Sequence, residues 1–449
     1  MTTADHTAPA VTVKKRSPIS WVPTLYFAQG LQFFVVMLIA GLMFKSMGVA
    51  NDLIARWTGV LGLAWAFKPL WSPFLEMARS KKLIVVALQF TGAIGLALLA
   101  LAVQLPMFFA ASIAVLFLLA YASATHDIAC DGLYMAALDA RSQAAYAGWQ
   151  GAFFNASKFL TLGGLLVLAG HLEKSVGVHN AWSAIFVLLA VLLAAIAAYN
   201  AWALPGTLNT GHADLTLASV TRTLRDVVGD FLSKPGIGLA ILFIVLFRAA
   251  EGQVQTIGPL FMLEARDQGG LGLTTDQIGI VYGTAGTLAF LLGSILGGYF
   301  TSWLGLKRAM FFLILGMMVP NLVFAWLAHA RPSDLNVIGT AVSIEMFGYG
   351  FGFVGMILYI MQAVAPGRFQ TAHYALGTGV MQLGFILSKT ISGDIQLALG
   401  YERFFLWTVL CGLPVLALMF FVRIPGRSDA TSTAPDAAVD AVGNKPAGA

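Results

Sequence analysis

The feature that most constrains this chain is a succession of twelve apolar stretches, each about 18 residues long or longer. Each is long enough to cross the ~30 Å hydrocarbon core of a bilayer as a helix. In lipid every backbone amide needs an internal hydrogen bond, and a helix supplies these bonds within one segment. A water-soluble all-α protein could not cover so many helices that are apolar all round. The sequence therefore predicts a polytopic, all-α membrane protein.

The composition supports this prediction and excludes other classes. Only 10% of the residues are charged and 58% are hydrophobic, whereas about 25% are charged in a typical soluble domain. The net charge of +5 forms no basic stripe interleaved with aromatics, which argues against binding of nucleic acid. The two cysteines, Cys130 and Cys411, lie in separate apolar stretches, which predicts two buried thiols rather than a disulfide or a metal pair. We expect no cofactor and no metal site.

The apolar stretches fall into two sets of six, separated by a pause at 204–236. We expect five parts: a cytoplasmic tail (1–19), a six-helix bundle (20–203), a cytoplasmic linker (204–236), a second six-helix bundle (237–423) and a disordered cytoplasmic tail (424–449). The twelve transmembrane helices are predicted at 20–44, 56–75, 83–103, 107–138, 146–170, 181–203, 237–264, 276–302, 307–329, 335–361, 369–397 and 402–423.

The positions of the basic residues predict the orientation. Most lysines and arginines outside the spans fall on one side, among them Lys14, Lys15, Arg16, Lys81, Lys82, Lys307 and Arg308. The positive-inside rule then places both termini in the cytoplasm. Within the linker, "LTLASVTRTLRDVVGDFLSKPG" carries apolar residues at helical spacing, which predicts an amphipathic helix at the cytoplasmic interface. A tether between the halves is favoured over a regulatory role.

Ionisable residues inside the spans are the first functional candidates, because each costs about 2.5–3.5 kcal/mol on insertion scales. Asp127 and Asp131 lie one turn apart and share a face with Tyr134. Their mutual repulsion and their burial both disfavour the charged form, so one of them could bind a proton reversibly near neutral pH. His126 adjoins the pair on another face, which predicts a histidine that packs against a neighbouring helix.

Other polar residues form similar stripes. Arg248, Glu251 and Gln255 share one face of the seventh span, and Glu345 and Tyr349 share one face of the tenth. The first span carries a comparable pair, Gln29 and Gln32. Polar stripes thus recur on the first helix of each triplet, as a central aqueous cavity requires.

Two structural alternatives stay open for these charges. Arg248 and Glu251 could form an intrahelical ion pair with no role in transport. Lys68, near one end of the second span, could snorkel to the interface or pair with Asp131.

The stretch "GGYFTSWLGLKR" (297–308) resembles the Gly-xxx-Asp-Arg-x-Gly-Arg-Arg loop of the major facilitator superfamily. Gly298, Gly305 and Lys307 match, whereas Ser302 replaces the aspartate. In that loop the glycine lets two helices approach closely, and the basic pair anchors the cytoplasmic side.

Three further stretches narrow the resemblance. "AFKPLWSPFLE", "SATHDIACDG" and "TAHYALGTG" are similar to stretches of AmpG-type muropeptide permeases, in the peptide–acetyl-coenzyme A–drug transporter branch. Lys68, Asp127 and Asp131 match the family pattern, while His126 and His373 each replace a glutamine.

This resemblance implies a major facilitator fold of twelve transmembrane helices in two pseudo-symmetric six-helix bundles, working by alternating access. It also implies proton-coupled import of a peptide-like solute such as an anhydromuropeptide, across a bacterial inner membrane. Uptake of a siderophore or another small organic solute, and a proton-independent uniporter, are the alternatives; a non-transporting membrane sensor is more distant. We expect no enzyme, since neither His-Glu-x-x-His nor Gly-x-Ser-x-Gly occurs. The expected partners are the solute, protons and the lipid bilayer, and we expect a monomer.

Each candidate residue then receives an expected role. Proton coupling is assigned to Asp127, Asp131, Glu251 and Glu345. Solute binding is assigned to Gln29, Gln32, Tyr134, Asn155, Lys158, Arg248, Gln255, Tyr349, Tyr374 and Gln382. Structural or gating roles are assigned to Lys68, Gly298, Gly305, Lys307 and Lys389.

Overall fold

The computed structural model describes residues 16–71, 75, 80–138, 140–206, 217–367 and 369–424. The regular structure of these residues is helical throughout, which confirms the predicted all-α class. The predicted tails at 1–19 and 424–449 fall almost wholly outside the described residues. By contacts the chain divides into two compact units, and each is described here by itself.

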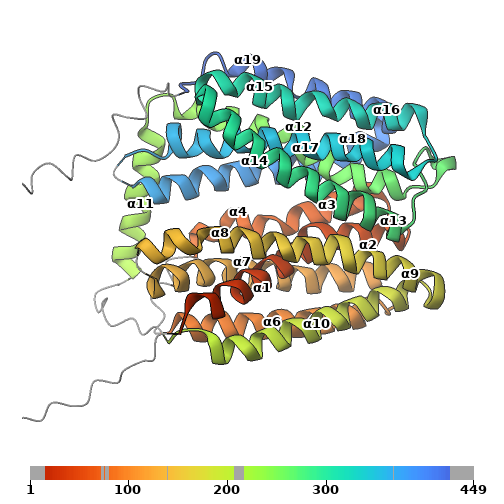
Figure 1. The fold of residues 1–449 in the computed structure, drawn as a ribbon, viewed down its shortest axis with the longest axis horizontal. Coiled ribbons are helices and arrows are strands. Elements are labelled where there is room, and N and C mark those ends of the chain that lie inside the picture. Colours follow the sequence, from red (N-terminus) through yellow and green to blue (C-terminus); the bar gives the residue numbers. More distant parts are fainter. Residues whose placement is uncertain are drawn as a thin grey trace, which may run out of the picture. The chain divides into compact units, whose positions relative to one another are not determined.

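Unit 1 comprises residues up to Thr221 together with Pro259–Gln268 and Gly272–Thr284. Its longest helices run side by side, with α6 packed against α7 and α10, and α1 packed against α8 (Figure 1). Its helices are η1 (Pro18–Ser20), α1 (Val22–Phe34), η2 (Val35–Ile39), α2 (Ala40–Ser46), α3 (Asn51–Leu61), α4 (Leu63–Phe67), η3 (Lys68–Leu70), α6 (Lys81–Ala102), α7 (Phe108–Ala137), α8 (Ala140–Lys158), η4 (Phe159–Leu165), α9 (Leu166–Val176), α10 (Val178–Ala203), η5 (Arg266–Gln268) and α13 (Thr275–Ile278).

Unit 2 comprises Arg222–Gly258, Gly269–Leu271 and the chain from Ala285 onward. Three further helices lie partly in each unit: α11 (Leu217–Ser233), α12 (Ile237–Leu263) and η6 (Gly279–Gly286). The remaining helices belong to unit 2: α14 (Thr287–Leu304), α15 (Leu306–Met318), η7 (Val319–Asn321), α16 (Leu322–Ala330), α17 (Leu335–Tyr359), η8 (Ile360–Val364), α18 (Gln370–Leu410) and α19 (Leu413–Leu418).

Ten helical segments of the described residues are long and apolar enough to cross a membrane. One of them, Ala372–Leu418, contains most of both of the last two predicted spans, because α18 consists of two helices that meet at Gly400, where φ is 72°. The predicted span at 56–75 lies on α3, α4 and η3, which are three shorter helices. Its residues 72–74 lie outside the described part of the chain.

Close packing of α14 on α17 rests on glycines in both helices. A Cβ atom at Gly293 or Gly350 would collide with a carbonyl oxygen of the facing helix, that of Phe347 or Phe290. Lipid provides no hydrophobic driving force for the association of membrane helices, so these helices associate through close packing. Small residues permit that close packing. Gly297 also faces the backbone of α17, whereas no atom lies within 4 Å of the would-be Cβ of Gly298.

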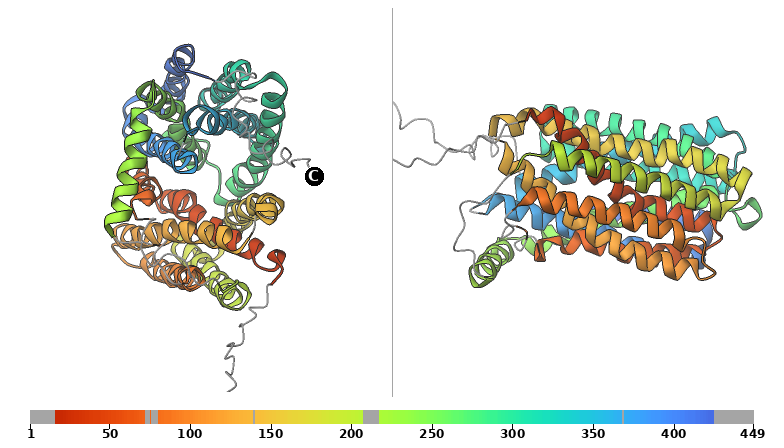
Figure 2. Two further views of the ribbon diagram at one scale, coloured as in Figure 1. Left: turned by 90° about the vertical axis from the view of Figure 1, so that its left-hand side faces the viewer. Right: turned by 90° about the horizontal axis from the view of Figure 1, so that it is seen from below.

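Within the predicted linker lies α11, which runs across the direction of α12 rather than along it (Figure 2). Val227 and Phe231 are its buried face. Buried His373 of α18 lies 3.3 Å from the carbonyl oxygen of Val227, and Lys234 donates to the carbonyl of Val364 at 2.6 Å. Burial lowers the pKa of Lys234, against the opposing effect of Asp230. Side-chain to backbone contacts therefore fasten α11 to unit 2.

Substitution of leucine for Gly350 should destabilise the protein by about 1–3 kcal/mol, the usual range for overpacking, because the facing carbonyl of Phe290 cannot withdraw. Thermal unfolding in detergent, followed by tryptophan fluorescence, measures the effect. Gly298→Leu is the matched control and should leave the melting temperature unchanged. Equal effects of the two substitutions would contradict this account of the α14–α17 contact.

Candidate functional site

The two aspartates of α7 form the centre of a polar site in unit 1, which we call the α7 carboxylate site. Asp127 accepts hydrogen bonds from the ammonium of Lys68 in η3 and from the amide of Gln29 in α1. Asp131 Oδ1 accepts from the hydroxyl of Tyr26, also in α1, at 3.0 Å. Their i, i+4 spacing puts both carboxylates on one side of α7, where α1 meets them with residues at i and i+3.

The two carboxylates differ in their surroundings. Asp127 is mostly buried, with 13% of its side chain exposed, and its partner is a cation. Asp131 is exposed and its partner is a tyrosine hydroxyl. That hydroxyl also accepts from Gln150 Nε2 of α8 at 2.7 Å. Lys68 thus neutralises the inner carboxylate, Asp127, rather than Asp131, which was the partner considered for it from sequence.

A second polar site lies in unit 2 between α12, α17 and α18. Arg248, with 5% of its surface exposed, donates to the hydroxyl of Tyr349 at 3.2 Å. Its guanidinium carbon lies 4.6 Å from the ring centre of Phe385 and 5.1 Å from that of Phe353. Rings at such distances stabilise a cation through their quadrupoles. This arrangement, the Arg248 site, holds a nearly buried positive charge among aromatic side chains.

The acidic residues beside Arg248 are fully buried. Neither carboxylate oxygen of Glu251 accepts a hydrogen bond, so the intrahelical ion pair considered from sequence is not formed as a bonded contact. Glu345 Oε1 accepts from Gln255 Nε2 at 3.3 Å, across from α12 to α17. The predicted polar stripes of the seventh and tenth spans therefore meet in one place.

The remaining candidates for solute binding are more scattered. Gln32 is 2% exposed and faces Gly92 of α6, and Tyr134 is 5% exposed and packs edge-on against Trp21. Asn155 donates to its own helix, at Gly151. The other three, half-buried in the structure, are Lys158 in α8 and Tyr374 and Gln382 in α18.

The residues expected to have structural or gating roles lie in different settings. Gly305 separates α14 from α15 with φ at 81°, a left-handed conformation that favours glycine. Lys307 is exposed at the start of α15, and Lys389 is 4% exposed within α18.

Sequence reasoning missed a polar cluster that joins α9 to α13 in unit 1, which we call the α9–α13 cluster. Lys174 Nζ lies 2.9 Å from Asp276 Oδ1, and Glu173 accepts from the Thr275 hydroxyl at 2.7 Å. Lys45 and Glu264 form a further ion pair beside it. Four of these residues, Lys45, Glu173, Lys174 and Thr275, border an open cavity of about 340 Å³. The sequence signal that could have revealed this cluster was the presence of opposite charges at the ends of several predicted spans, all on the same side of the membrane.

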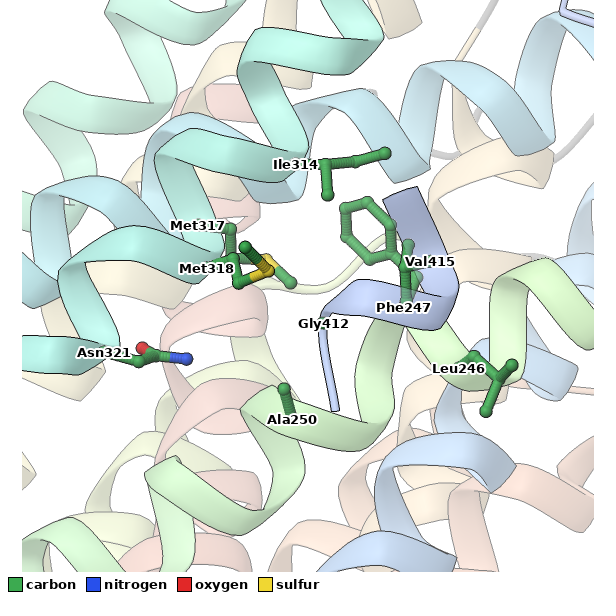
Figure 3. Close-up of a pocket in the computed structure, with 9 residues that line it drawn as sticks. All are labelled: Leu246, Phe247, Ala250, Ile314, Met317, Met318, Asn321, Gly412 and Val415. Carbon is green, nitrogen blue, oxygen red and sulfur yellow. The ribbon is translucent and has the colours of Figure 1, made fainter. Parts of the chain in front are cut away.

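An apolar pocket in unit 2 is too small to hold a solute. Its volume is about 10 Å³, room for no more than one water molecule. Figure 3 shows the side chains around it, drawn from α12, α15, η7 and α19: Leu246, Phe247, Ala250, Ile314, Met317, Met318, Asn321, Gly412 and Val415.

Comparisons with known proteins agree with this architecture. The family model described as Major Facilitator Superfamily matches residues 24–392. "Putative transporter AmpG 4" of Rickettsia conorii is 21% identical over 415 residues, covering 89% of this chain and 95% of that protein. "Anhydromuropeptide permease" of Escherichia coli K12 is 26% identical over 380 residues, covering 81% and 71%. The resemblance to AmpG-type permeases is thus confirmed.

Solved structures support the fold. The nucleoside transporter NupG superposes with a TM-score of 0.66 at 17% identity, covering 90% of this chain and 99% of that chain. A bacterial homolog of the human lysosomal transporter Spinster, in an inward-facing and unoccupied conformation, gives a TM-score of 0.69 at 12% identity, covering 91% and 97%. At these identities the likeness establishes the fold alone.

Removal of one member of the Lys68–Asp127 pair should destabilise the protein more than removal of both. Lys68→Met leaves a mostly buried carboxylate without its cation, whereas Lys68→Met with Asp127→Asn leaves two neutral side chains. A double-mutant cycle from thermal unfolding should give a coupling of about 1–3 kcal/mol. Strictly additive effects would mean that the contact contributes nothing to stability.

Proposed function

This chain belongs to the major facilitator superfamily, and from that premise we propose that it imports a small peptide-like solute, such as an anhydromuropeptide, together with protons. Its similarity to proteins named as AmpG transporters and anhydromuropeptide permease supports the class of solute. The ten apolar helical segments make it a multi-pass membrane protein. Alternating access, both termini in the cytoplasm and a monomeric state belong to the same proposal.

The observation that carries the proposal is the asymmetry of the α7 carboxylate site. Asp127 already has a cation, and its charge is therefore stabilised. Asp131 has a hydroxyl as its partner and is exposed, and in this proposal its exposed side is the route by which it exchanges a proton with water. When a conformational change moves Asp131 away from water, its ionised carboxylate becomes energetically unfavourable. Binding of a proton neutralises the carboxylate and removes that unfavourable energy. Asp131 is thus the proposed proton carrier, and the charge of Asp127 contributes to the electric field at Asp131.

The energy available is sufficient for accumulation. One charge that moves inward gains about 2.3 kcal/mol per 100 mV of membrane potential. This corresponds to a concentration ratio of roughly 50, since 1.4 kcal/mol is a factor of ten.

Arg248 is the proposed anchor for an anionic group of the solute, such as a peptide carboxylate. Its Nε has no hydrogen-bond partner although the side chain is nearly buried, and the planar guanidinium matches a carboxylate. Glu251, with two unbonded oxygens, is suited to an ammonium group or to a second proton. These contacts favour a solute that carries charged groups, as a peptide does, over an uncharged solute.

The α9–α13 cluster suits a contact that opens and closes. Its members are ion pairs and hydrogen bonds, which can be exchanged for water with little loss.

Asp131→Asn should abolish accumulation of a radiolabelled anhydromuropeptide in proteoliposomes under an imposed pH gradient, because asparagine cannot carry the proton. Exchange of internal for external solute should partly survive. Asp267→Asn, which changes an exposed carboxylate in η5, is the control and should transport normally. Unchanged dependence on the pH gradient in Asp131→Asn would remove Asp131 from this role, and a uniporter would show no such dependence even in the parent.

Arg248→Gln should raise the KM for a solute that carries a free carboxylate by roughly 10–100-fold, because a hydrogen bond to a charged group is worth about 1.5–3 kcal/mol. An amidated analogue should lose much less. Arg403→Gln, which changes an exposed arginine, serves as the matched control. Equal losses for the acid and the amide would exclude Arg248 as the carboxylate anchor.

A further inference from the structure

A line of buried polar side chains passes behind the α7 carboxylate site, and the proposed transport mechanism does not use it. Thr24 of α1 donates to Asn200 Oδ1 of α10 at 2.7 Å, and Asn200 Nδ2 donates to Gln89 Oε1 of α6 at 3.1 Å. Gln89 Nε2 lies 3.1 Å from His126 Nε2 of α7. Asn200, Gln89 and His126 are fully buried. We call these four residues the buried amide line.

The contact with Gln89 fixes the position of the imidazole. Gln89 Nε2 and His126 Nε2 lie 3.1 Å apart, and this contact joins α6 to α7 whichever of the two groups donates. Cys130 Sγ, one turn further along α7, lies 3.5 Å from His126 Nδ1 and 3.4 Å from His126 Nε2. His126 therefore contacts both Gln89 of α6 and the thiol of its own helix, as expected of a histidine that packs against a neighbouring helix.

The buried amide line and the α7 carboxylate site occupy neighbouring stripes of one helix. His126 and Cys130 are four residues apart, as are Asp127 and Asp131, and the two stripes differ by about 100° around the helix axis. α7 can contact Gln89 through one stripe and Lys68 and Tyr26 through the other in only one rotation about its axis. A turn by one residue would press a carboxylate against the buried amide of Gln89 and withdraw Asp127 from Lys68.

Apolar packing defines this rotation in part, because Leu119 lies against Gly95 of α6 and Leu133 is fully buried. Between these two leucines α7 is rich in alanine, with Ala120, Ala122, Ala124 and Ala129 all buried. Small side chains of one size interlock little, so they distinguish poorly between rotations.

We propose that His126 is a positioning residue: through its hydrogen bond to Gln89 it fixes the rotation of α7 and so presents Asp127 to Lys68 and Asp131 to the exposed side. Its relevance to transport rests on the proposed function, but the rotation itself can be tested without a solute.

The native thiol of Cys130 reports the rotation, since it is buried directly beside exposed Asp131. In a Cys411→Ser background Cys130 is the single thiol, and N-ethylmaleimide should label it slowly in membranes. His126→Leu and Gln89→Leu should each speed labelling about tenfold or more, the factor that corresponds to loss of one buried hydrogen bond. His126→Gln keeps a side chain that can bond Gln89 and should label nearly as slowly as the parent.

Leu189→Ala in α10 is the matched control, because it opens a cavity in unit 1 without touching the buried amide line. It should lower the melting temperature at least as much as His126→Leu while Cys130 stays protected. The proposal is overturned if Leu189→Ala exposes Cys130 equally at equal loss of stability, or if His126→Leu leaves Cys130 protected.

Transport provides the second readout. With an anhydromuropeptide as the probe, His126→Leu should displace the pH profile of uptake, whereas a merely structural role would reduce the amount of active protein at an unchanged profile. If the parent itself moves no anhydromuropeptide, the proposed function fails, and the labelling experiment still decides whether His126 positions α7.

Discussion

The contact between Lys68 and Asp127 is the interaction on which the polar interior of unit 1 depends. A carboxylate inside an apolar helix bundle is costly unless a cation and hydrogen-bond donors meet it. Lys68 supplies the cation and Gln29 supplies a donor, and these come from two helices other than α7. Because Asp127 is neutralised in this way, its neighbour Asp131 can remain one turn away with only a hydroxyl as its partner.

The two units handle buried charge by different means. In unit 1 an acid is neutralised by a base, whereas in unit 2 a base is surrounded by rings. The faces of Phe353 and Phe385 lie within about 5 Å of Arg248, and they stabilise its charge without competing for its N–H donors. An arginine held by aromatic rings keeps donors available for a solute, which an arginine in a bidentate ion pair would not. The same property makes the Arg248 site, rather than the α7 carboxylate site, the better candidate for solute recognition.

Much of this structure could be predicted from the sequence, because hydropathy and helical spacing are local properties. The helical class and the residues that share a face on α7, α12 and α17 follow from spacing alone. Contacts between residues of different helices do not follow from spacing. Spacing could not show that Lys68 meets Asp127 instead of Asp131, nor that Tyr26 and Gln150 join the site, since those contacts depend on how α1 and α8 are rotated against α7. Spacing also could not show that Gly297 rather than its neighbour Gly298 faces α17, since a shift of one residue turns a helix by about 100°.

The histidine at position 126 shows how such rotations become fixed. A glutamine at this place could also bond the amide of Gln89, but with different chemistry. An amide can present either a donor or an acceptor by flipping, whereas a neutral imidazole presents one of each from nitrogens fixed in a rigid ring. Gln89 and the thiol of Cys130 both contact the ring, so it has less freedom than an amide would have. Histidine therefore restricts the rotation of α7 more than glutamine would. The same restriction fixes the direction in which Asp127 and Asp131, on the adjoining stripe, point.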